Sequence, residues 1–174
     1  MALCRIIAAA VLTAALAAPA TAGAAQGRRG AAPRVQAASL VSTAAAVGER
    51  YWGAVPCNGQ IQVVAKQSVP AALAPDSDAW VTFDSSLGAN DLAAPAGSYT
   101  NCVIGFARWR WPTSASMRAD WGMFCATMTH ELGHLLGRPH DDTRGSVMTT
   151  VFTDRSSVPQ SCRASRPGRT ARET

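Results

Sequence analysis

The sequence predicts a single domain of mixed α/β fold. Residues 37–52 carry apolar residues at three- and four-residue steps, and residues 121–136 follow a candidate helix cap, so both are predicted to be helical. Three segments are rich in β-branched and aromatic residues and are predicted to be strands: residues 60–66, 79–84 and 101–109. A chain of 174 residues can form one such domain, which we place at residues 37–162.

The N-terminus has the pattern of a secretory signal peptide. Arg5 is followed by a short apolar run over residues 6–18, then by Pro19 and by the small-residue cleavage pattern of residues 20–22. We therefore expect residues 1–25 to be removed and the protein to be secreted. The alternative is an alanine-rich leader that the protein retains.

The segments that flank the predicted domain lack apolar clusters. Residues 26–36 show no periodicity, and residues 163–174 carry four arginines, so we expect a flexible N-terminal segment and a disordered basic tail. The net charge of +5 comes almost wholly from scattered arginines, because Lys66 is the only lysine. Without a continuous basic surface or a second apolar run, the composition argues against nucleic acid and membrane partners. We expect a monomer.

The first predicted helix has one apolar face. Its members recur at helical spacing: Leu40, Val41, Ala44, Val47 and Tyr51. The strands at residues 60–66 and 79–84 follow, and residues 85–100 are rich enough in Gly, Ser, Asn, Asp and Pro to predict a long surface loop. Such a loop could carry a calcium ion through Asp84, Asn90 or Asp91, but no recognisable calcium-ligand pattern supports one.

The third predicted strand contains a glycine and is followed by an unusual run of arginine and tryptophan. Gly105 within residues 101–109 marks either a bulge or a point of close backbone approach. Residues 108–111 read Arg-Trp-Arg-Trp. They have two interpretations: the tryptophans cover the sheet while the arginines face water, or the run edges a binding cleft.

Four cysteines remain once the signal peptide is removed, and an even number in an exported protein indicates two disulfides. Four cysteines allow three pairings. We favour Cys57 with Cys102 in the sheet half, and Cys125 with Cys162. Cys125 lies five residues before His130, about 140° around the helix, so it does not share the histidine's face.

The second predicted helix carries the candidate site, with Asp120 as its candidate N-cap. His130 and His134 are four residues apart, so both imidazoles lie on one face and can reach one ion. Glu131 lies about a quarter-turn from His130, where it can contact water at that ion but is poorly placed to bind the ion itself. The pattern His-Glu-x-x-His on a helix is typical of zinc hydrolases.

His140 can be a third ligand only if the helix ends before it. On a continuous helix it would lie about 15 Å from His130 along the axis. Gly137 can adopt the left-handed conformation that ends a helix, and Pro139 cannot continue one. We therefore predict that the chain turns back after Gly137 and brings His140 to the same metal ion.

Residues 130–141 together with Met148 resemble the signature of metzincin zinc metalloproteases, His-Glu-x-x-His-x-x-Gly-x-x-His followed by a methionine turn. Met148 follows His140 by eight residues, which is similar to the short spacing in matrixins. The resemblance implies a zincin fold: a twisted mixed sheet, two main helices and a small irregular C-terminal subdomain. It also implies that Asp141 supports the site from below, bonded to backbone near the methionine turn.

The resemblance further implies a secreted zinc-dependent endopeptidase that acts on proteins or peptides. In this family an edge strand above the cleft pairs with an extended substrate, and we assign that strand to residues 101–109 or their continuation. Zinc would activate a water, and Glu131 would act as general base. No tyrosine follows Met148, so the additional tyrosine of astacin-like members is missing.

Two other functions are compatible with the same residues. One is a non-catalytic, zinc-stabilised extracellular binding module. Glu131 argues against it, because a purely structural zinc site usually has four protein ligands and does not need that carboxylate. The other is a zinc amidase that acts on a non-protein cell-wall substrate, for which the activation of water would be the same.

Overall fold

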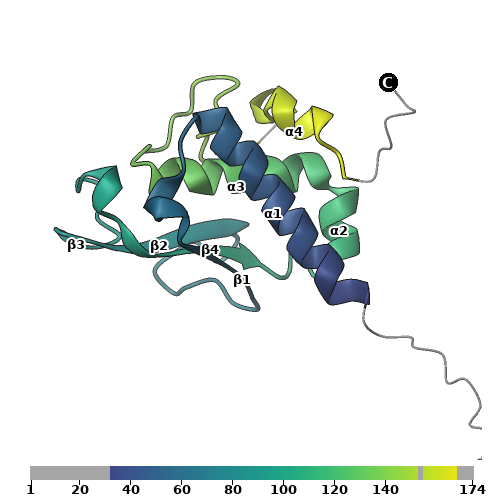
Figure 1. The fold of residues 1–174 in the computed structure, drawn as a ribbon, viewed down its shortest axis with the longest axis horizontal. Coiled ribbons are helices and arrows are strands. Elements are labelled where there is room, and N and C mark those ends of the chain that lie inside the picture. Colours follow the sequence, from purple (N-terminus) through teal and green to yellow (C-terminus); the bar gives the residue numbers. More distant parts are fainter. Residues whose placement is uncertain (1–31, 153–154, 168–174) are drawn as a thin grey trace, which may run out of the picture.

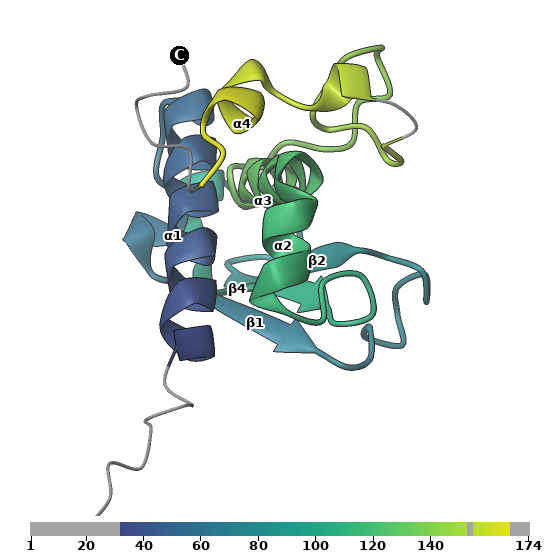
Figure 2. The same ribbon diagram turned by 90° about the vertical axis from the view of Figure 1, so that its right-hand side faces the viewer.

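The computed structural model describes residues 32–152 and 155–167 of the chain. A four-stranded sheet forms one layer, and helices α1 (Ala32–Trp52) and α3 (Trp121–Leu135) form a second layer over one of its faces (Figure 1). The two helices cross, with α3 running over the sheet and α1 packed beside it (Figure 2). The predicted mixed α/β class is confirmed.

The last strand in the sequence occupies the middle of the sheet, whose order is β1-β4-β2-β3. β1 (Ile61–Lys66) pairs in parallel with β4 (Thr100–Ala107), and β2 (Ala79–Ser85) pairs antiparallel with the other side of β4. β3 (Gly88–Ala89) pairs only with the end of β2. The three predicted strands are present near their expected positions, and β3 lies inside the segment that we predicted to be a loop throughout.

α3 is the central helix of the molecule. Every residue from Phe124 to Leu135 is buried. A helix that is enclosed on almost every side packs between other layers rather than on the surface. It begins at Trp121, as predicted, but Asp120 makes no side-chain cap: its carboxylate instead forms an ion pair with Arg110, at 2.8 Å.

A glycine sets the distance between α1 and α3. A Cβ atom at Gly48 would lie 2.6 Å from Leu132 Cδ1 and 3.2 Å from Thr129 Cα. Because glycine has no Cβ, the two helix backbones can approach closely at this point.

The buried face of α1 matches the prediction except at its C-terminal end. Leu40, Ala44 and Val47 are at most 1% exposed, whereas Tyr51, predicted on the same face, is 45% exposed. Trp52 packs inward in its place, and its indole N–H donates to the carbonyl oxygen of Thr129 at 2.8 Å. This bond links the end of α1 to α3 one residue before His130.

Helical structure extends beyond the predicted bounds at two places. α1 begins at Ala32, inside the segment 26–36 that we predicted to be flexible, and proline in a first helical turn is tolerated because its N–H would have no partner there. α2 (Ser114–Ala119) lies in a segment for which we predicted neither a helix nor a strand. The Thr113 hydroxyl caps it by accepting from the backbone N–H of Ser116 at 3.1 Å.

α4 (Gln160–Ala164) lies on the side of α3 away from the sheet (Figure 2). It extends two residues into the tail 163–174 that we predicted to be disordered. The predicted signal peptide, residues 1–25, and the end of the tail from residue 168 lie outside the described residues. None of the helices in the described part of the chain has the length and hydropathy that a membrane span requires.

Gly105 is a point of close approach, which was one of its two predicted roles. It faces Trp80 across the β2–β4 pair. A Cβ atom at Gly105 would lie 2.2 Å from Trp80 Cε2, so the indole can lie across the sheet only where a side chain is missing.

Both favoured disulfides are present. Cys57 is bonded to Cys102 and joins the turn before β1 to β4. Cys125 is bonded to Cys162 and joins α3 to α4. The pairing agrees with the prediction, and two disulfides are compatible with an extracellular protein.

Candidate metal centre

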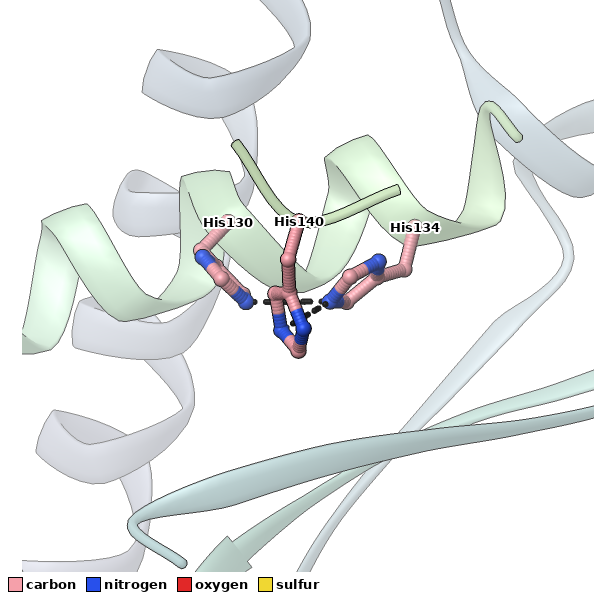
Figure 3. A group of neighbouring side chains, drawn as sticks. All are labelled: His130, His134 and His140. Atoms are coloured by element: carbon pink, nitrogen blue, oxygen red, sulfur yellow. Dashed lines mark hydrogen bonds between the residues drawn. The ribbon is translucent and has the colours of Figure 1, made fainter. Parts of the chain in front are cut away.

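The three histidines come together beneath α3. His130 and His134 project from adjacent turns of the helix, and His140 reaches the same point from the chain that follows it (Figure 3). The Nε2 atom of His134 lies 3.0 Å from Nε2 of His130 and 3.2 Å from Nε2 of His140. All three candidate ligand atoms lie within 4.8 Å of one another, and the group could hold a metal ion.

Backbone carbonyls orient the two helical imidazoles. His130 Nδ1 donates to the carbonyl oxygen of Val147 at 2.8 Å, and His134 Nδ1 donates to that of Arg138 at 2.8 Å. Because a carbonyl oxygen can only accept, each Nδ1 carries the proton and each Nε2 of the neutral ring presents a lone pair. Metal-binding histidines are commonly fixed in this tautomer by such a bond.

Lone pairs that converge at this distance repel one another unless a cation lies between them. In a tetrahedral zinc site the Zn–N distance is about 2.0–2.1 Å, which places ligand nitrogens about 3.3 Å apart. The observed separations of 3.0 and 3.2 Å are close to that value. The donor set of three imidazoles therefore fits a metal ion with a fourth position left for another ligand.

Burial keeps the helical histidines in the neutral form that binds metals. Burial, and then the neighbouring His134, lower the pKa of His130 to about 4. Burial also lowers the pKa of His134, against the opposing effect of its bond to the Arg138 carbonyl. Neutral imidazoles do not have to lose a proton before they coordinate a metal.

Glu131 is buried beside the histidines with a 5% exposed side chain. Burial raises the pKa of its carboxyl group to about 8. A metal ion at the histidines would act in the opposite direction, because a nearby positive charge favours the ionised carboxylate. The position, next to the ligands but not among them, is the one predicted from the spacing.

α3 ends one residue after His134, and Gly137 adopts the left-handed conformation predicted for it. Gly137 has φ +74°. The N–H of Gly137 donates to the His134 carbonyl at 2.9 Å, and the N–H of Arg138 donates to the Gly133 carbonyl at 2.9 Å. This pair of bonds is a Schellman motif, which reverses the chain direction at a helix end. The turn leads the chain back toward the helix and to His140.

Met148 packs against the helix between the two histidine turns. A Cβ atom at Gly133 would lie 2.5 Å from Met148 Sδ and 2.8 Å from Trp52 Cζ2. Gly133 therefore provides the space in which the methionine and the tryptophan meet the helix. Gly133 was not among the predicted site residues, although a glycine inside a helix, where it costs about 1 kcal/mol relative to alanine, is a signal of close packing.

Asp141 and Asp142 both bond to the chain around Met148. The backbone N–H of Asp141 donates to the Met148 carbonyl at 2.9 Å, and its carboxylate accepts from the N–H of Thr143 at 3.0 Å and also bonds the side chain of Ser146, two residues before Met148. Asp142, which we did not predict to have a role, reaches the chain beyond Met148. Its carboxylate accepts from the N–H of Thr150 at 2.8 Å.

Hydrogen bonds hold both carboxylates in the ionised form. The bonds from Thr143 lower the pKa of Asp141, and the bonds from Thr150 lower that of Asp142. Both side chains are exposed, so these bonds lie at the surface of the molecule.

A cleft of about 940 Å³ runs along α3 past the histidines. α3 contributes Met123, Thr127 and the histidine turn to its lining. β2, the segment 73–78 that precedes it and the segment 149–152 contribute most of the remaining lining. An extended chain could therefore pass between β2 and α3 and come to the histidines.

β2, and not β4, presents a free edge to this cleft. β4 is paired on both sides, so our assignment of residues 101–109 as the substrate-pairing strand is wrong. The N–H and C=O of Phe83 bond to Asn90 on the outer side of β2, both at 2.8 Å. Because alternate residues direct their backbone groups to the same side, those of Ala79 and Val81 point outward too, where no described strand pairs with them.

Residues 108–111 are divided between the two predicted roles. Trp111 is 2% exposed in the core against Phe106 and Phe124, and Trp109 is 52% exposed. Only Arg110 of the four lines the cleft, where it pairs with Asp78 at 3.4 Å. The run as a whole therefore does not form the cleft edge.

The candidate calcium ligands are occupied by protein groups. Asp84 accepts from the amide of Asn101 at 2.7 Å, Asn90 accepts from Phe83, and Asp91 accepts from the N–H of Ala93 at 2.9 Å. Within the described ranges, the histidine trio is the one cluster of at least three His, Cys, Asp or Glu ligands with suitable spacing. Calcium at this loop is not supported.

Comparisons with known proteins add nothing to this geometry. No family model, curated protein or solved structure matches the chain. What the site can do therefore follows from its own residues: three imidazoles for a metal ion, a buried carboxylate beside them, and a cleft with a free strand edge.

Proposed function

We propose that the protein is a secreted zinc-dependent endopeptidase of the metzincin type. One observation carries the proposal: three histidine Nε2 atoms converge while Glu131 is buried next to them in an open cleft. A zinc site that serves only the fold usually has four protein ligands. Three ligands and a neighbouring carboxylate favour catalysis over a purely structural role.

The mechanism assigns a separate task to each residue. His130, His134 and His140 would hold zinc, which when bound supplies a Lewis acid that activates water and polarises a carbonyl. Glu131 would accept the proton of the attacking water on its carboxylate and transfer it to the leaving amine. The Val147 and Arg138 carbonyls keep two of the imidazoles in the required tautomer throughout.

The free edge of β2 would position the substrate. The outward N–H and C=O groups of Ala79 and Val81 are the donors and acceptors that an extended peptide needs to add a strand. Such pairing recognises backbone rather than side chains and so favours a protein or peptide substrate. A cell-wall amidase would have less use for this edge.

Zinc content and proteolysis of the full secreted form and of Glu131→Gln test the proposal. We expect about one zinc per chain in both forms, because the variant keeps the three histidines. The variant should cut an unfolded protein at least about 100-fold more slowly, since it lacks the general base. Zinc binding without cleavage of any peptide by either form would refute the endopeptidase function. Equal cleavage by both forms would exclude Glu131 as the base.

A further inference from the structure

Two buried threonines on α3 differ in how their hydroxyl groups are satisfied. Thr129 is 0% exposed, and its hydroxyl donates to the carbonyl oxygen of Cys125 at 2.9 Å. Thr127 is 4% exposed, and its hydroxyl has no hydrogen-bond partner. A threonine inside a helix commonly bonds to the carbonyl four residues earlier, as Thr129 does. A buried hydroxyl without a partner needs another explanation.

Thr127 lies on the face of α3 that forms the cleft. It precedes His130 by three residues and Glu131 by four, which places all three on one side of the helix. Thr127 and Met123 both line the cleft, one and two turns before Glu131. The hydroxyl is not held by the helix backbone, so it is free to bond with a molecule in the cleft.

Among the described residues that line the cleft, Thr127 is the one with a buried side-chain polar atom that has no hydrogen-bond partner. Val81, Val151 and Phe152 line the same cleft and provide no hydrogen-bonding side chain. A wholly apolar substrate group placed here would leave the Thr127 hydroxyl without a partner and without water. A substrate hydroxyl or amide would satisfy it, and its own polar atoms would be satisfied in return.

We propose that Thr127 is a specificity-determining residue that hydrogen-bonds an uncharged polar side chain of the substrate. The proposal rests on the endopeptidase function argued above. It adds a substrate preference: among side chains of similar size near the cut bond, the site selects one that carries a hydroxyl or an amide.

The test uses peptides that differ only in hydrogen bonding. A cleaved sequence is varied at each position around the cut bond between members of a size-matched pair, valine with threonine and leucine with asparagine. Thr127→Val removes the hydroxyl but keeps the shape, and it should fold because the lost hydroxyl has no partner in the protein. Thr129→Val is the matched control two residues away, on the side of α3 that bonds Cys125.

At one peptide position near the cut bond, we expect the native enzyme to cleave the polar member of each pair faster than the apolar member. The ratio of kcat/KM for the polar peptide to kcat/KM for its apolar partner should fall by about 10-fold in Thr127→Val. This is the size of the effect expected from one hydrogen bond between neutral groups. The same ratio should be unchanged in Thr129→Val. A ratio that does not change in Thr127→Val overturns the inference and leaves the endopeptidase function intact.

Two further outcomes are decisive. An equal loss of kcat for every peptide would mean that Thr127 acts through Glu131, one turn away, and would overturn a substrate contact. If no peptide is cut, the same pairs are tested for binding to the zinc-loaded Glu131→Gln form. Binding that favours the polar member and depends on Thr127 supports the contact even though the endopeptidase function fails. Absence of binding overturns both.

Discussion

His130 and His134 are held by a buried helix, whereas His140 belongs to an exposed segment that is fixed by turns. The helical pair is 6% and 9% exposed, and its rings are oriented by backbone carbonyls. Around His140, the chain from residue 138 to residue 145 is exposed throughout and contains no helix or strand. Its course depends on Gly137 and on hydrogen bonds made by two exposed aspartates.

The difference indicates how the site is assembled. Packing of α3 between the sheet, α1 and α4 fixes two ligands regardless of the metal, because a buried helix cannot move without breaking the core. The third ligand depends on local conformation, which costs little to change. Variants of the two parts should therefore behave differently, and four predictions separate them.

Gly133→Ala should have the largest effect on stability, because the new Cβ would meet Met148 and Trp52 where the helical part is packed. We expect the free energy of unfolding to fall by about 2 kcal/mol, as in other overpacked cores. Denaturant unfolding measures this. Gly122→Ala is the control, since its Cβ would meet Val158 at an ordinary 3.7 Å and alanine favours the helix. Equal effects at the two glycines would contradict close packing at Gly133.

Gly137→Ala should act on the turn that brings in His140. An alanine at φ +74° is strained, and its Cβ would lie 3.3 Å from that of Ala96. We expect a loss of about 1.5 kcal/mol in unfolding free energy, together with weaker zinc binding. Gly53→Ala introduces similar strain at φ +66° with no atom within 4 Å. Gly53→Ala should lose stability without losing zinc affinity. If Gly53→Ala loses zinc affinity as much as Gly137→Ala does, the weaker zinc binding reflects general destabilisation and not the turn that positions His140.

Removal of His134 and of His140 should differ in the metal-free protein. His134→Ala deletes the bond to the Arg138 carbonyl as well as a candidate ligand. We expect it to lower metal-free stability by about 1 kcal/mol. His140→Ala deletes an exposed ring and should leave metal-free stability unchanged, while both variants lose zinc. Thermal unfolding with and without a chelator checks this, and equal metal-free stabilities would remove the distinction between the two parts.

Asp142→Ala should have the smallest effect, confined to the exposed segment. Its carboxylate accepts from the backbone N–H of Thr150, and that amide should exchange its hydrogen faster in the variant. Asp141→Ala should instead speed exchange at Thr143. Amide exchange followed by NMR distinguishes the two. If Asp141→Ala releases Thr150, the assignment of the Thr150 contact to Asp142 is wrong.

Much of the site could be predicted because its determinants are local. The four-residue spacing of His130 and His134 fixes their common face on any helix, and Gly137 marks the helix end whatever the rest of the fold. Glu131 takes its place from the same helix. The favoured cysteine pairing is present, although the sequence alone left three pairings open.

The missed features depend on contacts between distant segments. Nothing within residues 100–107 reveals that β4 pairs on both sides, since that follows from how β1 and β2 reach it. Asp120 is of a residue type that commonly caps helices, but its carboxylate pairs with Arg110 instead, which the local sequence does not indicate. Asp141 and Asp142 are adjacent and chemically identical, and only the fold of the chain beyond Met148 decides which one reaches Thr150.

The Cys125–Cys162 bond has a consequence for cleavage of this chain itself. The two cysteines lie on either side of all three histidines in the sequence, so the disulfide closes a covalent ring that contains the whole candidate site. A single cut in the exposed segment 141–145 leaves both fragments attached to each other through this disulfide. Nicked molecules would run intact on a non-reducing gel and separate only when the disulfide is reduced.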